Sequence, residues 1–197
     1  MKYYLDITLL PDAEANLGFL WQKVYQQIHL GLAENKIAKN QSAIAVSFPD
    51  YGNKEFPLGD KLRLFAATQT ELEKLNTAKW LSRLTDYTHV KSIKQVPEKV
   101  DQHVCFKRKQ FKSNLIKEAS RRAKYKDESL TEALNHFEHY DQKCRLPYIN
   151  MSSLSMKNVN DASRNFKLFI GQEIFDKAQS GGFNCYGLSK TATIPWF

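Results

Sequence analysis

The first 97 residues alternate between two hydrophobic periods, and this alternation restricts the fold more than any other feature of the sequence. A period of two predicts strands, and a period of 3.6 residues predicts helices. The predicted order is strand, helix, strand, strand, helix, strand, at 3–9, 14–34, 43–48, 61–67, 70–84 and 89–96. This order is typical of a ferredoxin-like sheet with split βαβ units, which is also the RNA-recognition-motif topology. Pro97 marks the expected end of this first domain, residues 1–97.

The residues from 98 to 197 predict a distinct C-terminal α+β domain. A basic strand is expected at 104–111, and Ser113-Asn114 can cap a basic helix, about 113–126 with its helical run at 115–126. A second helix is expected at 129–140, where Ser129 and Glu132 have the spacing of a capping box. Short strand-like runs follow at 146–151, 166–170 and 183–188, with a polar loop at 152–165.

Positive charge is concentrated in one segment. The chain has a net charge of +8, and residues 103–126 carry that whole excess because Glu118 is the only acid among them. The basic residues of the segment are Lys107, Arg108, Lys109, Lys112, Lys117, Arg121, Arg122, Lys124 and Lys126. Charge of one sign indicates a polyanionic partner, either nucleic acid or a membrane surface. A compact basic helix suits a short RNA hairpin, because the deep groove of duplex RNA opens near the end of a stem.

Several other classes of protein are disfavoured. The three cysteines, Cys105, Cys144 and Cys185, form no close pair, so neither a disulfide framework nor a zinc site is expected. No apolar run approaches the roughly 20 residues that span a bilayer, and the N-terminus lacks the apolar region of a signal peptide. We therefore expect a cytoplasmic protein without a membrane partner. Nucleotide-phosphate loops and paired catalytic carboxylates are absent from the sequence, and no cofactor is expected.

Histidine is the natural proton carrier for RNA cleavage through the RNA's own 2′-hydroxyl, a reaction that needs no metal. The chain has five, at 29, 89, 103, 136 and 139. His29 is the best candidate because it lies at the edge of the apolar stripe of helix 14–34, where packing can hold the ring while its nitrogens stay accessible. His136 and His139 stand three residues apart, but no further ligand has metal-site spacing, so no metal is expected.

Ordered short motifs cover nearly the whole chain. They are YYLDITLLPD at 3–12, IAVSFPD at 44–50, LGDKLRLFA at 58–66, RKQFKSN at 108–114, LPYINMSSLS at 146–155, NFKLFI at 165–170 and GGFNCYGLSKTATIPWF at 181–197. In this order, and with His29 in the first helix, the set resembles the type I-F CRISPR repeat endoribonucleases, which process precursor CRISPR RNA. The resemblance implies a ferredoxin-like domain followed by a C-terminal domain with a basic RNA-binding helix.

The same resemblance assigns roles to individual residues. His29 would transfer the proton at the scissile phosphate, Tyr186 would orient His29, and Ser153 would hold the ribose, with Ser155 as a second serine. Arg108 and Gln110 would read bases at the foot of the stem, and Phe166 would stack on the terminal base pair. The remaining RNA-binding residues would be basic ones, Lys112, Lys117, Arg121, Arg122 and Lys124.

The implied reaction is metal-independent cleavage at the 3′ base of the repeat hairpin, which leaves a 2′,3′-cyclic phosphate and a 5′-hydroxyl. The implied partners are the CRISPR repeat hairpin, as precursor and as mature guide RNA that stays bound, and the other subunits of the type I-F interference complex. Two other classes remain open: a non-catalytic RNA-hairpin-binding protein and a basic DNA-binding regulator. A membrane-surface role fits least, because the basic helix lacks a strong apolar face opposite its charges.

Overall fold

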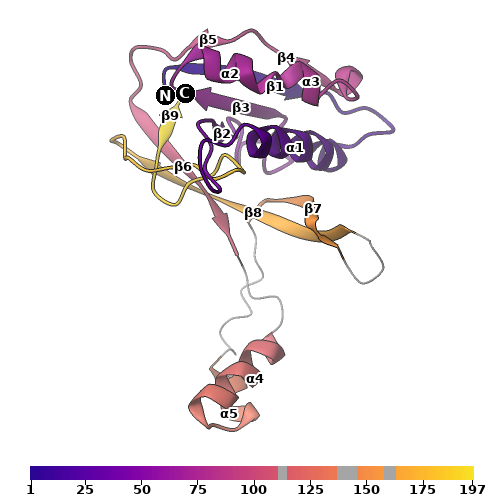
Figure 1. Ribbon diagram of the computed structural model, residues 1–197, viewed down its shortest axis with the longest axis vertical. Helices are drawn as coiled ribbons and strands as arrows, with labels where there is room; N and C mark the ends of the chain where they lie inside the picture. Colours follow the sequence, from indigo (N-terminus) through magenta and orange to yellow (C-terminus); the bar gives the residue numbers. More distant parts are fainter. Residues whose placement is uncertain (111–114, 137–145, 158–162) are drawn as a thin grey trace. The chain divides into compact units, whose positions relative to one another are not determined.

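The computed structural model describes residues 1–110, 115–136, 146–157 and 163–197, except the side chains of 115, 154–157, 163 and 164. It is a mixed α+β structure with two antiparallel sheets, which form one compact unit, residues 1–108 with 147–197. Residues 109–146 form a second, helical unit (Figure 1).

The first sheet has the strand order β2-β3-β1-β4, with β5 also paired to β1. Its strands are β1 (Tyr3–Leu9), β2 (Ala45–Ser47), β3 (Lys61–Ala66), β4 (Thr88–Val90) and β5 (Lys94–Gln95). Helix α1 (Leu17–Glu34) connects β1 to β2, and α2 (Gln69–Leu75), α3 (Thr77–Trp80) and a 3₁₀ turn (Thr85–Tyr87) connect β3 to β4. The predicted order along the first 97 residues is therefore confirmed, except that the strand predicted at 89–96 is interrupted after Val90 and forms the two short strands β4 and β5.

Local hydrogen bonds change two of the predicted helices. The Asp12 carboxylate accepts hydrogen bonds from the Glu14 and Ala15 amides, which holds this stretch in a turn. Asn16 then caps the helix by accepting from the Phe19 amide, so α1 begins at residue 17 and the predicted start at 14 is wrong. The helix predicted at 70–84 is broken because Asn76 adopts a left-handed conformation, φ 51°, which ends α2 and caps α3.

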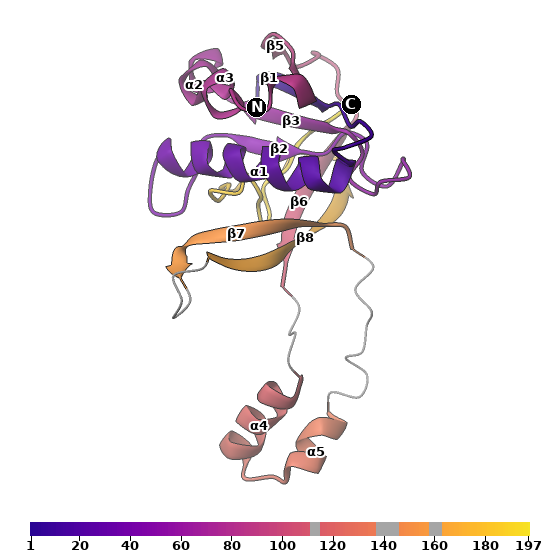
Figure 2. The same ribbon diagram turned by 90° about the vertical axis from the view of Figure 1, so that its right-hand side faces the viewer.

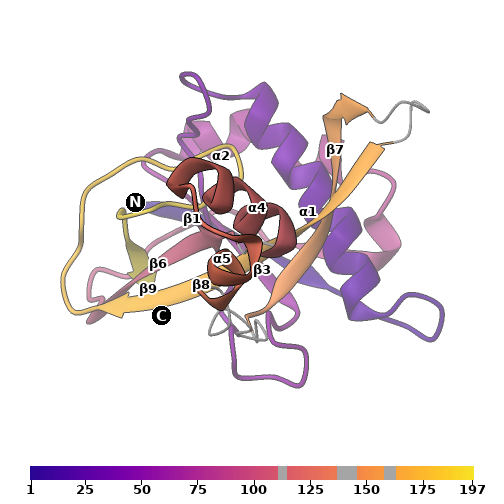
Figure 3. The same cartoon turned by 90° about the horizontal axis from the view of Figure 1, so that it is seen from below.

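Helix α1 lies between the two sheets (Figure 2) and supplies much of the core. Its predicted apolar stripe is confirmed at Leu20, Val24, Ile28 and Leu32, which are buried, whereas Leu17 at its start is half-buried. Burial of each such side chain stabilises the fold by about 1.5–3 kcal/mol relative to exposure. Strand β7 crosses α1 and packs against one flank of the helix (Figure 3), so side chains on that flank can reach the second sheet.

The two central strands of the first sheet carry polar and aromatic residues on their second face. Asp6 of β1 pairs across the strands with Arg63 of β3, and the Arg63 guanidinium binds both Asp6 carboxylate oxygens at 2.6 and 3.1 Å. Arg63 also donates to the Phe197 carbonyl and lies 4.3 Å from the centre of the Phe197 ring. That ring contacts Tyr4 and Phe65 edge to face. The last residues of the chain therefore cover this face.

The second sheet has the order β7-β8-β6-β9. Its strands are β6 (Gln102–Lys109), β7 (Tyr148–Lys157), β8 (Ser163–Phe175) and β9 (Ile194–Trp196). The loop predicted at 152–165 is wrong over most of its length, because β7 and β8 stay paired through Ser153 and Arg164. The strand predicted at 183–188 is also wrong. Asn184 accepts hydrogen bonds from the Tyr186 and Leu188 amides and makes this run a turn.

The helical unit contains α4 (Leu115–Lys126) and α5 (Leu130–Asn135), which pack against each other. The predicted bounds of the basic helix at 115–126 and the capping box of Ser129 and Glu132 are confirmed. The predicted cap at Ser113-Asn114 and the end of the helix predicted to 140 lie outside the described residues. Within the described residues, no helix combines the length and apolar character needed to cross a bilayer.

Candidate functional site

His29 lies in the last third of α1, half-buried, with one ring nitrogen tied to the backbone. Its Nδ1 is 2.8 Å from the carbonyl oxygen of Cys185. Because a carbonyl oxygen can only accept, Nδ1 carries the hydrogen, and the neutral ring keeps its lone pair on Nε2. No group in the described part of the chain binds Nε2. The prediction that both ring nitrogens stay accessible is therefore wrong for Nδ1.

Tyr186 holds the His29 ring from one side. The two rings are parallel within 1° and their centres are 4.1 Å apart. The Tyr186 carbonyl accepts a hydrogen bond of 2.8 Å from the hydroxyl of Tyr25, which lies one turn before His29 on α1. The structure therefore brings together His29 and Tyr186, which are separated by 157 positions in the sequence. Their rings stack, and the Tyr25 hydroxyl ties the Tyr186 backbone to the same helix.

A tight turn carries Tyr186 to this position. Gly187 has a φ of +70°, a conformation that residues with a Cβ rarely adopt. Its carbonyl accepts from the Val46 amide at 2.9 Å, and a Cβ at 187 would lie 2.4 Å from Val46 Cγ2. The turn consequently sits directly on β2, and only glycine fits at its closest point of approach.

Arg108 and Phe166 complete a cluster of rings and charge around Tyr186. The Arg108 guanidinium carbon lies 5.2 Å from the centre of the Tyr186 ring and 5.4 Å from that of Phe166. Phe166 meets Tyr186 edge to face at 6.5 Å. Arg108 comes from β6 and Phe166 from β8, which are neighbours in the second sheet. The structure thus assembles His29, Tyr186, Arg108 and Phe166, all of them predicted site residues.

The surroundings lower the pKa of His29 below its ordinary value of 6.5. Burial is the main cause, because it disfavours the charged ring, and the nearby Arg108 charge acts in the same direction. The hydrogen bond to the Cys185 carbonyl opposes them by favouring the protonated form. The net effect favours a neutral imidazole with an available Nε2 lone pair at neutral pH, which is the form that a general base requires.

The predicted serines lie on β7, which packs on α1. The Ser152 amide donates a hydrogen bond of 3.0 Å to Oε1 of Gln26, and this bond joins the strand to the helix beside His29. Ser153 follows at once, half-buried and opposite Arg164 of β8. Ser155 also belongs to β7, but its side chain lies outside the described residues.

The predicted RNA-binding residues of the helical unit do not share one environment. Lys117, Arg121 and Lys124 are exposed. At 100° per residue they fall within about 60° on one face of α4. Arg122 instead points to the other side, where its Nε binds the Glu128 carboxylate at 2.6 Å. Gln110 is exposed after the end of β6, and Lys112 lies outside the described residues.

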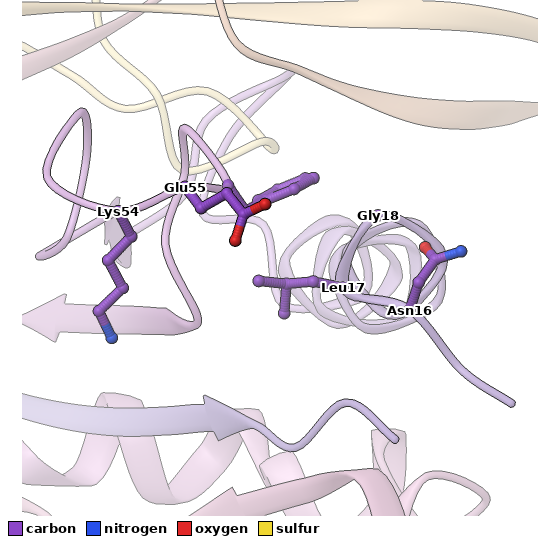
Figure 4. Close-up of a pocket in the computed structure, with 6 residues that line it drawn as sticks. Asn16, Leu17, Gly18, Lys54 and Glu55 are labelled. Carbon is purple, nitrogen blue, oxygen red and sulfur yellow. The ribbon is translucent and has the colours of Figure 1, made fainter. Parts of the chain in front are cut away.

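A metal site and a ligand pocket are the two alternatives to the cluster around His29. Among the described residues, no three His, Cys, Asp or Glu side chains gather into a group able to hold a metal ion, and His139 lies outside those residues. An open hollow lies at the start of α1 (Figure 4), lined by Asn16, Leu17, Gly18, Lys54, Glu55 and Phe56. The Lys54 amine is engaged by Asp60 and Asp50, at 2.8 and 3.4 Å, and no predicted site residue lines the hollow.

Sequence reasoning missed Tyr25, Gln26 and Asn184 as parts of this site. Tyr25 has a visible signal, because it lies four residues before His29 and so on the same side of the helix. Asn184 has a local signal as well, because an Asn side chain often accepts from the amide two residues further on and so favours a turn. Gln26 has none, since it acts on the distant Ser152 amide, which only the fold brings to it.

Comparison with known proteins gives a consistent relationship over the full length. The family model described as "CRISPR-associated protein (Cas_Csy4)" matches residues 4–197. A protein of Escherichia coli (strain UTI89 / UPEC), named CRISPR-associated endonuclease Cas6/Csy4, is 35% identical over 201 residues, covering 100% of both chains. A protein of the same name from Pseudomonas aeruginosa (strain UCBPP-PA14) is 32% identical over 199 residues, again with 100% of both chains covered. A solved structure titled as a Cas6-related gene from Pyrococcus furiosus aligns with a TM-score of 0.34 and 9% identity, over 98% of this chain and 99% of that one, too weakly to bear on the fold.

Proposed function

This chain belongs to the Cas_Csy4 family of CRISPR-associated proteins, and from that premise we propose how it cuts RNA. It is an endoribonuclease that processes CRISPR repeat RNA. The observation that carries the mechanism is the fixed His29 ring, with Nδ1 on the Cys185 carbonyl and one face on Tyr186. This arrangement leaves Nε2 as the one ring atom that can exchange a proton with a substrate.

His29 acts as a general base. Nε2 takes the proton from the ribose 2′-hydroxyl, and the 2′-oxygen attacks the adjacent phosphorus. The bond from phosphorus to the 5′-oxygen breaks, that oxygen takes a proton from solvent, and the products are a 2′,3′-cyclic phosphate and a 5′-hydroxyl. The attack is internal to the RNA, so the reaction needs a base and correct alignment and no metal ion. The lowered pKa of His29 supports this role.

Other residues bind and align the RNA. Ser153, with Ser155 as the second candidate, holds the ribose. Phe166 stacks on the terminal base pair, a contact worth about 1–3 kcal/mol. Arg108 and Gln110 read bases at the foot of the stem.

The basic residues of the segment hold the phosphates of the hairpin. Lys117, Arg121 and Lys124 do so from one face of α4. Lys112 and Arg122 are further phosphate-binding residues. The Glu128 pair of Arg122 favours a second role for this residue, in fixing α4 against the turn that follows it.

The finer architecture is proposed on the same basis. The order β2-β3-β1-β4, with helices after β1 and β3, supports a ferredoxin-like domain over residues 1–97. The second sheet, β7-β8-β6-β9, supports a distinct C-terminal domain over 98–197, although both sheets belong to one compact unit. We propose the cytoplasm as its location because repeat RNA is transcribed there. We also propose that the enzyme stays on its product, the mature guide RNA, and joins the other subunits of the type I-F interference complex.

A non-catalytic RNA-recognition module is less well supported. Such modules stack bases on aromatic residues of their two central strands. Here the corresponding face of β1 and β3 is covered by Phe197, which contacts Tyr4, Arg63 and Phe65.

The test is incubation of a labelled type I-F repeat hairpin with excess EDTA, with the wild type beside His29→Ala. One cut at the 3′ base of the hairpin is expected for the wild type and none for the variant, which should bind the hairpin equally well. A wild type that binds but does not cut a cognate repeat, or that cuts only when metal is restored, would contradict the proposal.

A further inference from the structure

Three side chains within five residues of α1 face the two segments that carry the other catalytic residues. They are Tyr25, Gln26 and His29. At about 100° per residue, His29 lies between Tyr25 and Gln26 when the helix is viewed along its axis. Each of the three makes a hydrogen bond to the backbone of a different residue, Tyr25 to Tyr186, His29 to Cys185 and Gln26 to Ser152.

Tyr25 and His29 together grip one turn. The Tyr25 hydroxyl donates to the carbonyl of Tyr186, and Nδ1 of His29 donates to the carbonyl of the preceding residue, Cys185, both at 2.8 Å. Tyr25 is 1% exposed and its ring stacks on Phe48, so its hydroxyl has little freedom to move. Burial also raises the pKa of Tyr25, which keeps the hydroxyl protonated as a donor.

Gln26 makes the equivalent connection to the second sheet. Its Oε1 accepts from the Ser152 amide at 3.0 Å. Ser153 is the next residue along β7, so the hydrogen bond at Ser152 fixes the position of that strand along α1, beside His29. A side-chain acceptor on a helix is an unusual partner for a strand amide, which would otherwise bond to a neighbouring strand or to water.

We propose that Tyr25 and Gln26 are positioning residues for the cleavage reaction. Tyr25 holds the turn that carries Tyr186 and thereby fixes the His29 ring. Gln26 holds the strand that carries Ser153. Both act through backbone hydrogen bonds, and neither touches the RNA. This inference rests on the proposed function, because it assigns the alignment of that reaction to one turn of α1.

Tyr25→Phe tests the first half by removing a single oxygen atom. The single-turnover rate constant for hairpin cleavage should fall about tenfold, since a small displacement of an aligned group has a large effect on rate. Hairpin affinity should stay unchanged. Tyr51→Phe is the matched control, because the Tyr51 hydroxyl makes the same kind of bond, 2.8 Å to the Ile170 carbonyl. Tyr51→Phe should lose about as much stability as Tyr25→Phe and should keep the wild-type cleavage rate. An equal loss of cleavage rate in both variants would overturn the inference.

A spectroscopic readout separates positioning from general weakening. In the RNA-free wild type, heteronuclear NMR of the neutral His29 ring should show the hydrogen on Nδ1. In Tyr25→Phe the loosened turn should let the Nε2–H tautomer become populated. A ring that keeps its tautomer together with an unchanged cleavage rate would refute the role of Tyr25. The NMR measurement needs no RNA, so its result does not depend on whether the protein cuts the hairpin. A wild-type protein that failed to cut would count against the proposed function, and the tautomer result alone would then decide the role of Tyr25.

Gln26→Leu tests the second half, with Gln27→Leu as its control. Gln27 is the next residue on the helix, and its side chain makes no hydrogen bond in the part of the chain that the structure describes. Gln26→Leu should slow cleavage about tenfold and Gln27→Leu should not. If Gln26 acts through Ser153, the double variant Gln26→Leu/Ser153→Ala should cut as fast as Ser153→Ala alone. Fully additive losses would show that Gln26 does not act through that serine.

Discussion

Replacing Gly187 by alanine should damage the active site through one close backbone approach. Alanine would have to adopt a φ near +70°, which costs about 1–2 kcal/mol for a residue with a Cβ. The new Cβ would also lie 2.4 Å from Val46 Cγ2 and 3.0 Å from the Val46 amide nitrogen. Relief of such a clash in a packed region costs about 1–3 kcal/mol more. The free energy of unfolding should therefore fall by about 2–5 kcal/mol.

Gly52→Ala separates the two contributions. Gly52 has a φ of +75°, but no atom lies within 4 Å of the position of its Cβ. Gly52→Ala should therefore lower the free energy of unfolding only by the conformational cost, about 1–2 kcal/mol. The difference between the two variants, measured by equilibrium urea denaturation, should equal the steric part, about 1–3 kcal/mol.

The cleavage assay then links this clash to function. To relieve it, the turn must lift from β2, which moves the Cys185 carbonyl and the Tyr186 ring away from His29. Gly187→Ala should consequently cut the hairpin more slowly under conditions where it remains folded, while Gly52→Ala cuts like the wild type. If the two variants have equal stability and both cut at the wild-type rate, the contact between this turn and β2 does not control the position of His29.

Four further outcomes are expected. The cleavage rate should rise with pH and level off above a midpoint below 6.5, and Arg108→Gln should raise the pKa of His29 in an NMR titration of the free protein, because it removes a nearby positive charge. Arg63→Met should lower the free energy of unfolding in urea by about 3–5 kcal/mol by leaving Asp6 buried without its partner, and adding Asp6→Leu should restore most of that stability. Lys117→Ala with Lys124→Ala should weaken hairpin binding and reduce the slope of log affinity against log salt by about 1 for each phosphate that the variant no longer neutralises. An unshifted pKa, a double variant no more stable than Arg63→Met, or an unchanged salt slope would contradict the respective reasoning.

The covered face of the first sheet argues against RNA binding in the manner of an RNA-recognition module. Asp6 and Arg63 occupy central positions of β1 and β3, and their buried ion pair would be costly without further contacts. Arg63 obtains those contacts from the Phe197 carbonyl and from the rings of Tyr4 and Phe197. The polar pair thus serves to seat the last residue of the chain on the first sheet.

Local sequence patterns were enough to predict much of the secondary structure. The alternation at 3–9, the apolar stripe of α1 and the basic run at 115–126 each predicted an element that the structure confirms, because these signals depend only on which residues neighbour one another along the chain. The charge of the segment 103–126 and the histidine on the flank of α1 are likewise properties of the sequence. The family relationship followed from the order of motifs, and the comparisons support it over residues 4–197.

Only the tertiary structure decided how the site is built. The run 183–188 has the composition of a strand, yet it forms a turn, and the contact of Gly187 with the distant Val46 holds that turn on β2. The same long-range contacts put the Cys185 carbonyl on Nδ1 of His29 and leave Nε2 for the substrate. The choice of tautomer and the burial that lowers the pKa depend on atoms from α1, β6 and the 183–188 turn together. No local pattern carries that information, because it arises only when the chain closes on itself.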